Sequence, residues 1–237
     1  NDSSVKALIV RIISPGGAVS SSDQIYYYIN RFKDRTNKPV IGFMQSVAAS
    51  GGYYSAVACD TIMAEPTAIT GSIGVIMNHL VIKSLLEEKL GINPVILKSG
   101  KRKDWPSMFS ETTEEQKQYL NDKLIEPAYE RFVTLVAKGR AAVLDRDEVR
   151  RLADGSIYPA PEALDNQLID AIGYFDDAVQ QAQQMANITG AQVIEYEERF
   201  SVWNLLNAKS RAAVELESQL LEYLAAPRLL YLWDGKE

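Results

Sequence analysis

The sequence is poor in the residues that build disulfides, metal centres and histidine-based catalytic sites. Its 237 residues include a single cysteine, Cys59, and a single histidine, His79. One cysteine cannot form an internal disulfide framework or a multi-cysteine zinc site. The apolar run around Cys59 is typical of a small buried side chain. We therefore expect neither a bound metal nor a cofactor.

Long hydrophobic runs and an excess of positive charge are also lacking. No stretch reaches the roughly 18–20 consecutive apolar residues that a membrane-spanning helix needs. The net charge of −6 argues against a broad nucleic-acid-binding surface. The sequence opens at Asn1, just before a strand-like run. We expect it to be part of a longer protein whose N-terminal membrane anchor has been removed.

Strand and helix patterns alternate along the first 43 residues. Residues 5–13 (VKALIVRII) are typical of a buried parallel strand, residues 20–35 have helical spacing, and residues 40–43 form a second apolar run. A long helix is expected over 113–138, with a break at Pro127 because proline lacks the backbone N–H. These patterns predict an α/β fold in which helices pack on a parallel sheet.

Shorter elements complete this prediction. We expect one domain over 1–198 and a helical tail over 199–237 that serves oligomerisation or acts as a self-peptide. The amphipathic pattern of the tail covers residues 208–225. Short strands are expected over 61–64, 94–98, 168–170 and 192–196, and short helices over 81–90, 146–153, 161–166 and 176–186.

Ser50 has the local sequence of an exposed nucleophile. It follows a predicted strand, precedes a predicted helix and is flanked by Gly51 and Gly52. At such a turn a hydroxyl can face the substrate, and the N–H of Gly51 can point toward a developing oxyanion. Local sequence alone favours the other interpretation, in which Ser50 simply caps a helix and the glycines permit tight packing. A second glycine turn, SPGG at 14–17, ends the first strand and can also present N–H groups, or act only as a turn.

The base that would activate Ser50 is not evident from local sequence. His79 lacks a recognisable carboxylate partner and fits an ordinary surface or cap residue. A lysine can act as a base when burial or neighbouring cations lower its pKa. Four cations crowd the loop after the predicted strand at 94–98, namely Lys98, Lys101, Arg102 and Lys103. A solvated basic loop is the other interpretation of this run.

Taken in order, these motifs resemble the signal peptide peptidase A type of serine peptidase, which is related in fold to Clp protease and crotonase. The resemblance covers residues 3–198. It is carried by SPGG (14–17), AASGGYYSA (48–56), TGSIGV (70–75), KSGKRKD (98–104), EPAYERFV (126–133), KGR (138–140) and ADGSIYPAPEALDNQLIDAIG (153–173).

The resemblance implies a Ser/Lys dyad. Ser50 corresponds to the nucleophile, Lys103 to the general base and Ser72 to the residue that orients this lysine. Gly17 and Gly51 correspond to the oxyanion-hole donors. Lys101 is a rival for the base because it lies in the same loop.

The resemblance also implies substrates, partners and a location. The expected substrates are cleaved signal peptides and other unfolded apolar peptides. The family forms homo-oligomeric rings on the extracytoplasmic side of the bacterial cytoplasmic membrane, held there by an N-terminal anchor. One departure is Ile13, where the family often has asparagine before SPGG. The alternatives are a crotonase-like acyl-CoA enzyme and a catalytically silent ring scaffold that binds peptides.

Overall fold

The computed structural model describes residues 2–196, 228–233 and 235. They divide into two compact units. The first unit comprises Asn1–Ile76, Ile125–Val193 and Leu229–Glu237, and the second comprises Met77–Leu124 and Ile194–Arg228. The first unit contains the main sheet, the serine and the glycine turns, whereas the second contains the lysine loop.

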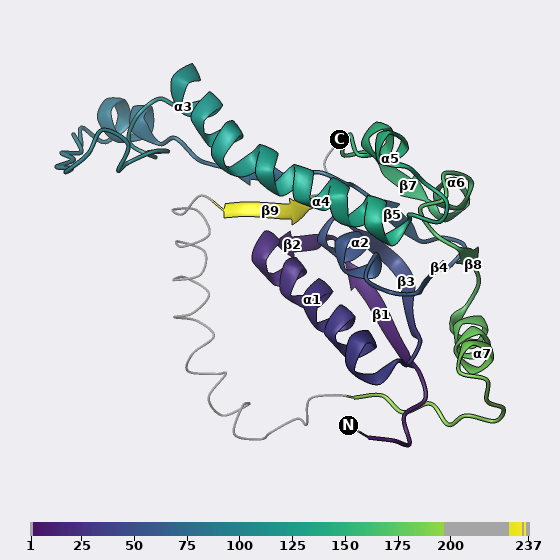
Figure 1. Cartoon of the computed structure of the whole chain (residues 1–237). Helices are drawn as coiled ribbons and strands as arrows, with labels where there is room; N and C mark the ends of the chain where they lie inside the picture. The colour runs from purple at the N-terminus through teal and green to yellow at the C-terminus, as the bar shows by residue number, and fades with distance from the viewer. Residues whose placement is uncertain (1, 197–227, 234, 236–237) are drawn as a thin grey trace. The chain divides into compact units, whose positions relative to one another are not determined.

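The main sheet is built around one long central strand, β3 (Val40–Ala49). β3 pairs in parallel with β1 (Leu8–Ser14) along one edge. Along its other edge it pairs in parallel first with β4 (Thr61–Ala64) and then with β5 (Ile69–Gly71). β8 (Ala171–Ile172) extends the sheet in parallel beyond β4, and β7 (Ile157–Pro159) pairs antiparallel with β5. Figure 1 shows these strands in the first unit. The expected α/β class, a mostly parallel sheet with flanking helices, is confirmed.

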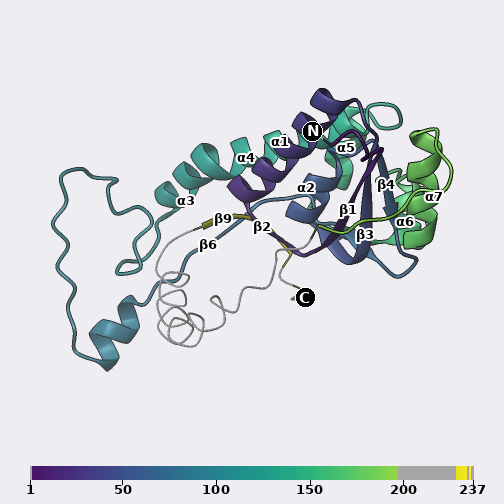
Figure 2. The same cartoon turned by 90° about the horizontal axis from the view of Figure 1, so that it is seen from below.

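Helices cover both faces of this sheet because the side chains of β3 alternate between them. Val40 and Met44 belong to the larger core, which α1 (Val19–Thr36), α2 (Gly51–Ala56) and α4 (Glu126–Gly139) help to build. Ile41 and Phe43 instead pack against α7 (Phe175–Met185) on the opposite face. Figure 2 shows α1 and α7 on opposite sides of the strands.

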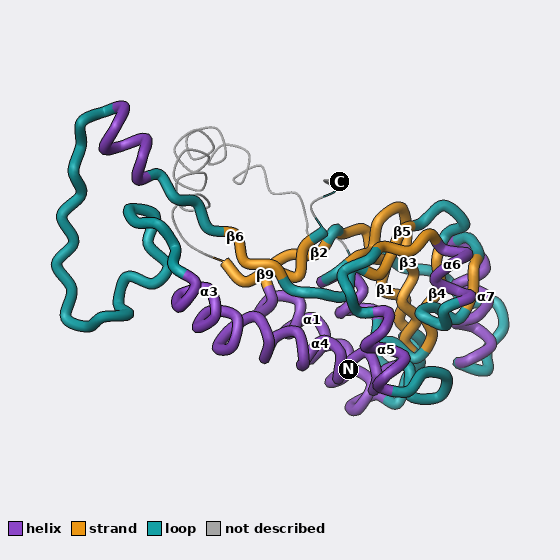
Figure 3. The backbone as a smooth tube through the Cα atoms, turned by 90° about the horizontal axis from the view of Figure 1, so that it is seen from above, coloured by secondary structure: helices purple, strands orange, loops and turns teal. Residues whose placement is uncertain are grey.

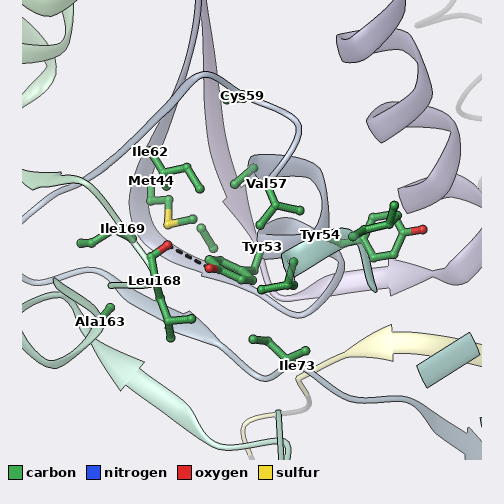
Figure 4. Packing of buried hydrophobic residues seen from close by; sticks show 14 of the residues in the cluster. Met44, Tyr53, Tyr54, Val57, Cys59, Ile62, Ile73, Ala163, Leu168 and Ile169 are labelled. Atoms are coloured by element: carbon green, nitrogen blue, oxygen red, sulfur yellow. Dashed lines mark hydrogen bonds between the residues drawn. The ribbon is translucent and has the colours of Figure 1, made fainter. Parts of the chain in front are cut away.

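The larger core anchors the segment that follows Ser50. Tyr53 and Tyr54 of α2 are fully buried, and the Tyr53 hydroxyl donates a hydrogen bond of 2.8 Å to the Leu168 carbonyl oxygen. Figure 4 shows Tyr53 near Met44, with its hydroxyl bonded to Leu168. The two tyrosines therefore fix α2, and with it the turn at its N-terminal end.

A second, small pairing joins the two ends of the first unit. β2 (Gly16–Ala18) runs antiparallel to β9 (Arg228–Leu232), as Figure 3 shows. In this pairing Gly17 lies opposite Tyr231. The remaining elements are β6 (Ile76–Asn78), η1 (Leu85–Lys89), α3 (Glu114–Leu120), η2 (Asn121–Ile125), α5 (Arg146–Leu152) and α6 (Ala160–Asp165). None of the described helices is long and apolar enough to cross a membrane.

Several sequence predictions of secondary structure need correction. Residues 94–98 and 192–196 form no strand, and the helix expected over 81–90 is reduced to a short helical segment around η1. An apolar run becomes a strand only where a neighbouring strand accepts its hydrogen bonds, and these runs have no such partner among the described residues. The helix expected over 208–225 lies outside the described residues.

The break expected at Pro127 is confirmed as a change of helix geometry. The π-helical turn η2 ends at Ile125, and α4 then begins with Pro127 in its first turn. Proline is tolerated at that position because the first N–H groups of a helix have no intrahelical acceptor.

Tyr231 should be a main contributor to the stability of the first unit. Its ring stacks on Tyr54 at 4.8 Å between ring centroids and lies 4.7 Å from Phe132, and its hydroxyl donates to the Ala128 carbonyl oxygen at 2.8 Å. Tyr231→Ala should lower the free energy of unfolding by about 3–5 kcal/mol, the usual cost of removing a buried aromatic ring. Tyr231→Phe removes only the hydroxyl and should cost about 1 kcal/mol. Urea unfolding measures both, and equal losses would contradict this account.

Candidate active site

Ser50 lies at a strained turn between the central strand and α2. Its backbone has φ 53° and ψ −114°, a conformation that non-glycine residues rarely adopt. Two hydrogen bonds of 2.8 Å hold it there: its N–H donates to the Gly71 carbonyl oxygen, and its own carbonyl accepts from the Tyr54 N–H. Strain of this kind costs about 1–3 kcal/mol and persists only where the surrounding structure enforces it, most often at functional sites.

The two glycine turns meet beside Ser50. A methyl group built on Gly51 would collide with the Ser22 hydroxyl and lie 3.2 Å from the backbone nitrogen of Gly17. A methyl group on Gly16 would lie 2.8 Å from the Gly51 nitrogen. Only residues without a side chain allow this approach. The backbone N–H groups of Gly17 and Gly51 therefore come from adjacent segments, as an oxyanion hole requires.

Ser72 directly follows Gly71, whose carbonyl oxygen accepts the Ser50 N–H, and a separate hydrogen bond to the residue before β7 holds it. Its φ is 49°, and its N–H donates to the Ser156 carbonyl oxygen at 2.7 Å. Gly71, with φ 84°, leaves room for the Tyr158 ring, which a methyl group there would approach to 2.5 Å. The block at 153–173 was identified in the sequence, but its role in supporting Ser72 became apparent only from the pairing of β5 with β7.

The lysine loop belongs to the second unit, and most of its cations have partners. Lys98 forms a salt bridge with Asp104 at 2.7 Å, and Lys101 forms one with Glu115 at 3.2 Å. The hydrogen bond from Lys98 lowers the pKa of the Asp104 carboxyl. The Arg102 guanidinium lies 4.6 Å from the ring centroid of Tyr119.

Lys103 differs from its neighbours. It is exposed, and no carboxylate among the described residues forms a salt bridge with its ammonium group. The carboxylates paired with Lys98 and Lys101 offset the repulsion that the sequence suggested for this loop. Of the loop's three lysines, Lys103 is the one that no ion pair in the described part of the chain engages.

His79 also lies in the second unit. Its Nε2 is buried and has no hydrogen-bond partner among the described residues.

The model of peptidase family S49 matches residues 32–189. The chain belongs to peptidase family S49. Across 99% of its length it is 34% identical to a protein of Enterococcus faecium that is named for signal peptide peptidase SppA, and the match covers 70% of that relative. It is also 36% identical to the chloroplastic serine protease SPPA of Arabidopsis thaliana, over 77% of the chain and 26% of that protein. The expected serine peptidase of the signal peptide peptidase A type is thus confirmed.

A solved structure, the ClpP1 N165D mutant from Listeria monocytogenes, covers 74% of this S49 chain and 78% of its own. The TM-score is 0.46 and the sequence identity is 16%.

Two adjacent glycines of this S49 peptidase should respond very differently to an added methyl group. Gly16→Ala should lower the free energy of unfolding by about 1–3 kcal/mol, because the position has φ 110° and the methyl group would collide with the Tyr231 carbonyl oxygen. Gly17→Ala should change it by less than about 0.5 kcal/mol, because no atom lies within 4 Å of the added methyl group. Denaturant unfolding of both variants tests this, and equal stabilities would refute the close approach at Gly16.

Proposed function

We propose that this peptidase hydrolyses peptide bonds with Ser50 as nucleophile and Lys103 as general base. The observation that carries the proposal is the strained Ser50 turn, whose serine is flanked by the N–H groups of two glycine segments. A serine hydroxyl needs an adjacent base to become an effective nucleophile, and a neutral lysine is suited to this role. Lys103 is the preferred lysine because Lys98 and Lys101 are engaged in salt bridges.

The reaction would proceed in two acyl-transfer steps. The Ser50 hydroxyl oxygen attacks the substrate carbonyl carbon while its proton passes to the Lys103 amine. The lysine then protonates the leaving amine as the C–N bond breaks, which leaves an ester on Ser50. Lys103 next takes a proton from water, the resulting hydroxide attacks the ester, and the acid product departs as Ser50 regains its proton.

The negative charge on the substrate oxygen would be stabilised by backbone donors. The N–H of Gly51 lies at the first turn of α2, where helix N–H groups have no intrahelical acceptor. Gly17 has a strand partner, Tyr231, in the pairing of β2 with β9. Because the N–H of Gly51 has no intrahelical acceptor, Gly51 is the donor on which the proposal depends most, with Gly17 as the second. Ser72 would orient the amine of Lys103 in its neutral state.

The proposed substrates are cleaved signal peptides and other unfolded apolar peptides. The name of the Enterococcus faecium relative supports this class. We further propose a homo-oligomeric ring, anchored on the extracytoplasmic side of the bacterial cytoplasmic membrane. Large apolar side chains exposed in the second unit, including Leu85, Leu90 and Leu97, support contact with other copies of the chain.

A set of charge-conserving variants tests the dyad. Ser50→Ala should reduce kcat for a fluorogenic apolar peptide by at least about 10³-fold. Lys103→Arg should do the same, because arginine remains protonated and cannot accept the serine proton. Lys101→Arg is the matched control and should retain activity within about threefold, since a surface ion pair contributes little. Loss of activity in Lys101→Arg together with retention in Lys103→Arg would transfer the role of the base to Lys101.

The pH dependence of the reaction gives an independent test. The value of kcat/KM should rise with pH as the lysine loses its proton, because only the neutral amine accepts the proton of Ser50. A rate that falls as pH rises through the same range would contradict a lysine base. Hydrolysis of an acyl-CoA thioester by wild type and Ser50→Ala alike would instead favour the crotonase-like alternative.

A further inference from the structure

β5, the strand that directly precedes Ser72, contains a buried hydroxyl that bonds to the end of β3 just before Ser50. Thr70 is fully buried, and its Oγ1 donates a hydrogen bond of 2.7 Å to the carbonyl oxygen of Ala48. Ala48 is itself fully buried and lies two residues before Ser50. A buried hydroxyl is costly unless it is hydrogen-bonded, and valine would fill the same space without that cost. The hydroxyl thus has a defined partner at the end of β3.

The register places this bond at the base of the strained turn. β3 and β5 pair with Ala48 opposite Thr70 and Ala49 opposite Gly71. The next contact along the strand is the hydrogen bond from the Ser50 N–H to the Gly71 carbonyl oxygen. β5 contains three residues, so its pairing with β3 supplies few backbone bonds. The Thr70 hydroxyl adds one more hydrogen bond between the two strands, at the point where the strained turn begins.

We propose that Thr70 is a positioning residue, whose hydroxyl holds the end of β3 and thereby fixes the hydroxyl of Ser50 for attack. The proposal rests on Ser50 being the nucleophile. A strained turn relaxes when its surroundings stop enforcing it. A displacement of about 1 Å at a reacting group can reduce the rate by about 10²-fold. Loss of the Thr70 hydroxyl therefore lowers kcat while leaving the peptide-binding surfaces, and hence KM, largely unchanged.

Three substitutions at Thr70 separate the hydroxyl from its packing. Thr70→Val keeps the shape and removes the hydroxyl, whereas Thr70→Ser keeps the hydroxyl and removes a methyl group. We expect Thr70→Val to lower kcat about 10- to 100-fold at nearly constant KM, in line with the cost of a small misplacement. Thr70→Ser should stay within about threefold of wild type, even though the lost methyl group reduces its thermal stability. If Thr70→Val does not fold, Thr70→Ala against Thr70→Ser makes the same comparison, since these two differ only by the hydroxyl.

Phosphonylation by a fluorophosphonate, in which the serine oxygen attacks phosphorus and fluoride leaves, provides a readout of Ser50 itself. Its rate of reaction should fall in Thr70→Val in the same proportion as kcat. Tyr129→Phe is the matched control: it removes another hydroxyl-to-carbonyl bond, the 2.9 Å contact to Ala153, and should leave both rates unchanged. An unchanged rate in Thr70→Val, or an equal loss in Thr70→Ser, overturns the proposal. Failure of the probe to label Ser50 in wild type would instead overturn the proposed nucleophile.

Discussion

The site depends on one main-chain hydrogen bond, from the Ser50 N–H to the Gly71 carbonyl oxygen. This bond continues the pairing of β3 with β5 by one step, to a residue whose φ of 53° would otherwise be unfavourable. The bond fixes Ser50, the nucleophile of the proposed dyad, at the end of β3. Its acceptor, Gly71, is the last residue of β5 and is followed directly by Ser72. Both serines have positive φ values and both N–H groups are bonded to carbonyl oxygens, at Gly71 and Ser156 respectively. Main-chain contacts therefore fix both residues, and both serines are buried, so the exposed nucleophile expected from the sequence is not what the structure shows at Ser50.

Close approach of backbone to backbone is the second requirement. Gly16, Gly17 and Gly51 bring two segments together at distances that side chains would prevent at Gly16 and Gly51. Gly139 serves a related purpose at the other end of α2, since a methyl group there would lie within 3.0 Å of the Val57 side chain. α2 is thus held at its beginning by the serine turn, along its length by two buried tyrosines and at its end by α4. A rigid α2 keeps the Gly51 N–H in a fixed direction, as preorganised stabilisation of an oxyanion requires.

The sequence predicted those parts of the fold in which local pattern and tertiary pairing agree. The strand at Thr61–Ala64 and the helix around residues 20–35 lie where hydrophobic pattern and turn signals placed them. β5 and β7 were missed because each has three residues, too few for a periodic pattern, and each becomes a strand only through its partner. Residues 94–98 show the reverse case, an apolar run without a partner. Motif order indicated Ser50 and the glycine turns. Thr70 and Ser156 lie within the motifs at 70–75 and 153–173, but their hydrogen bonds to Ala48 and Ser72 join segments distant in sequence and could not be predicted from it.

Carboxylates near the lysine loop distinguish its three lysines from one another. Crowded cations in a sequence suggest repulsion, but the carboxylates that compensate them are identified only once the chain folds. Lys101 is paired with Glu115, which lies 14 positions away, and Lys98 with Asp104. Use of either lysine as a base would require its ion pair to be broken. Lys103 has no such salt bridge within the described part of the chain, so it is the lysine whose use as a base breaks no ion pair.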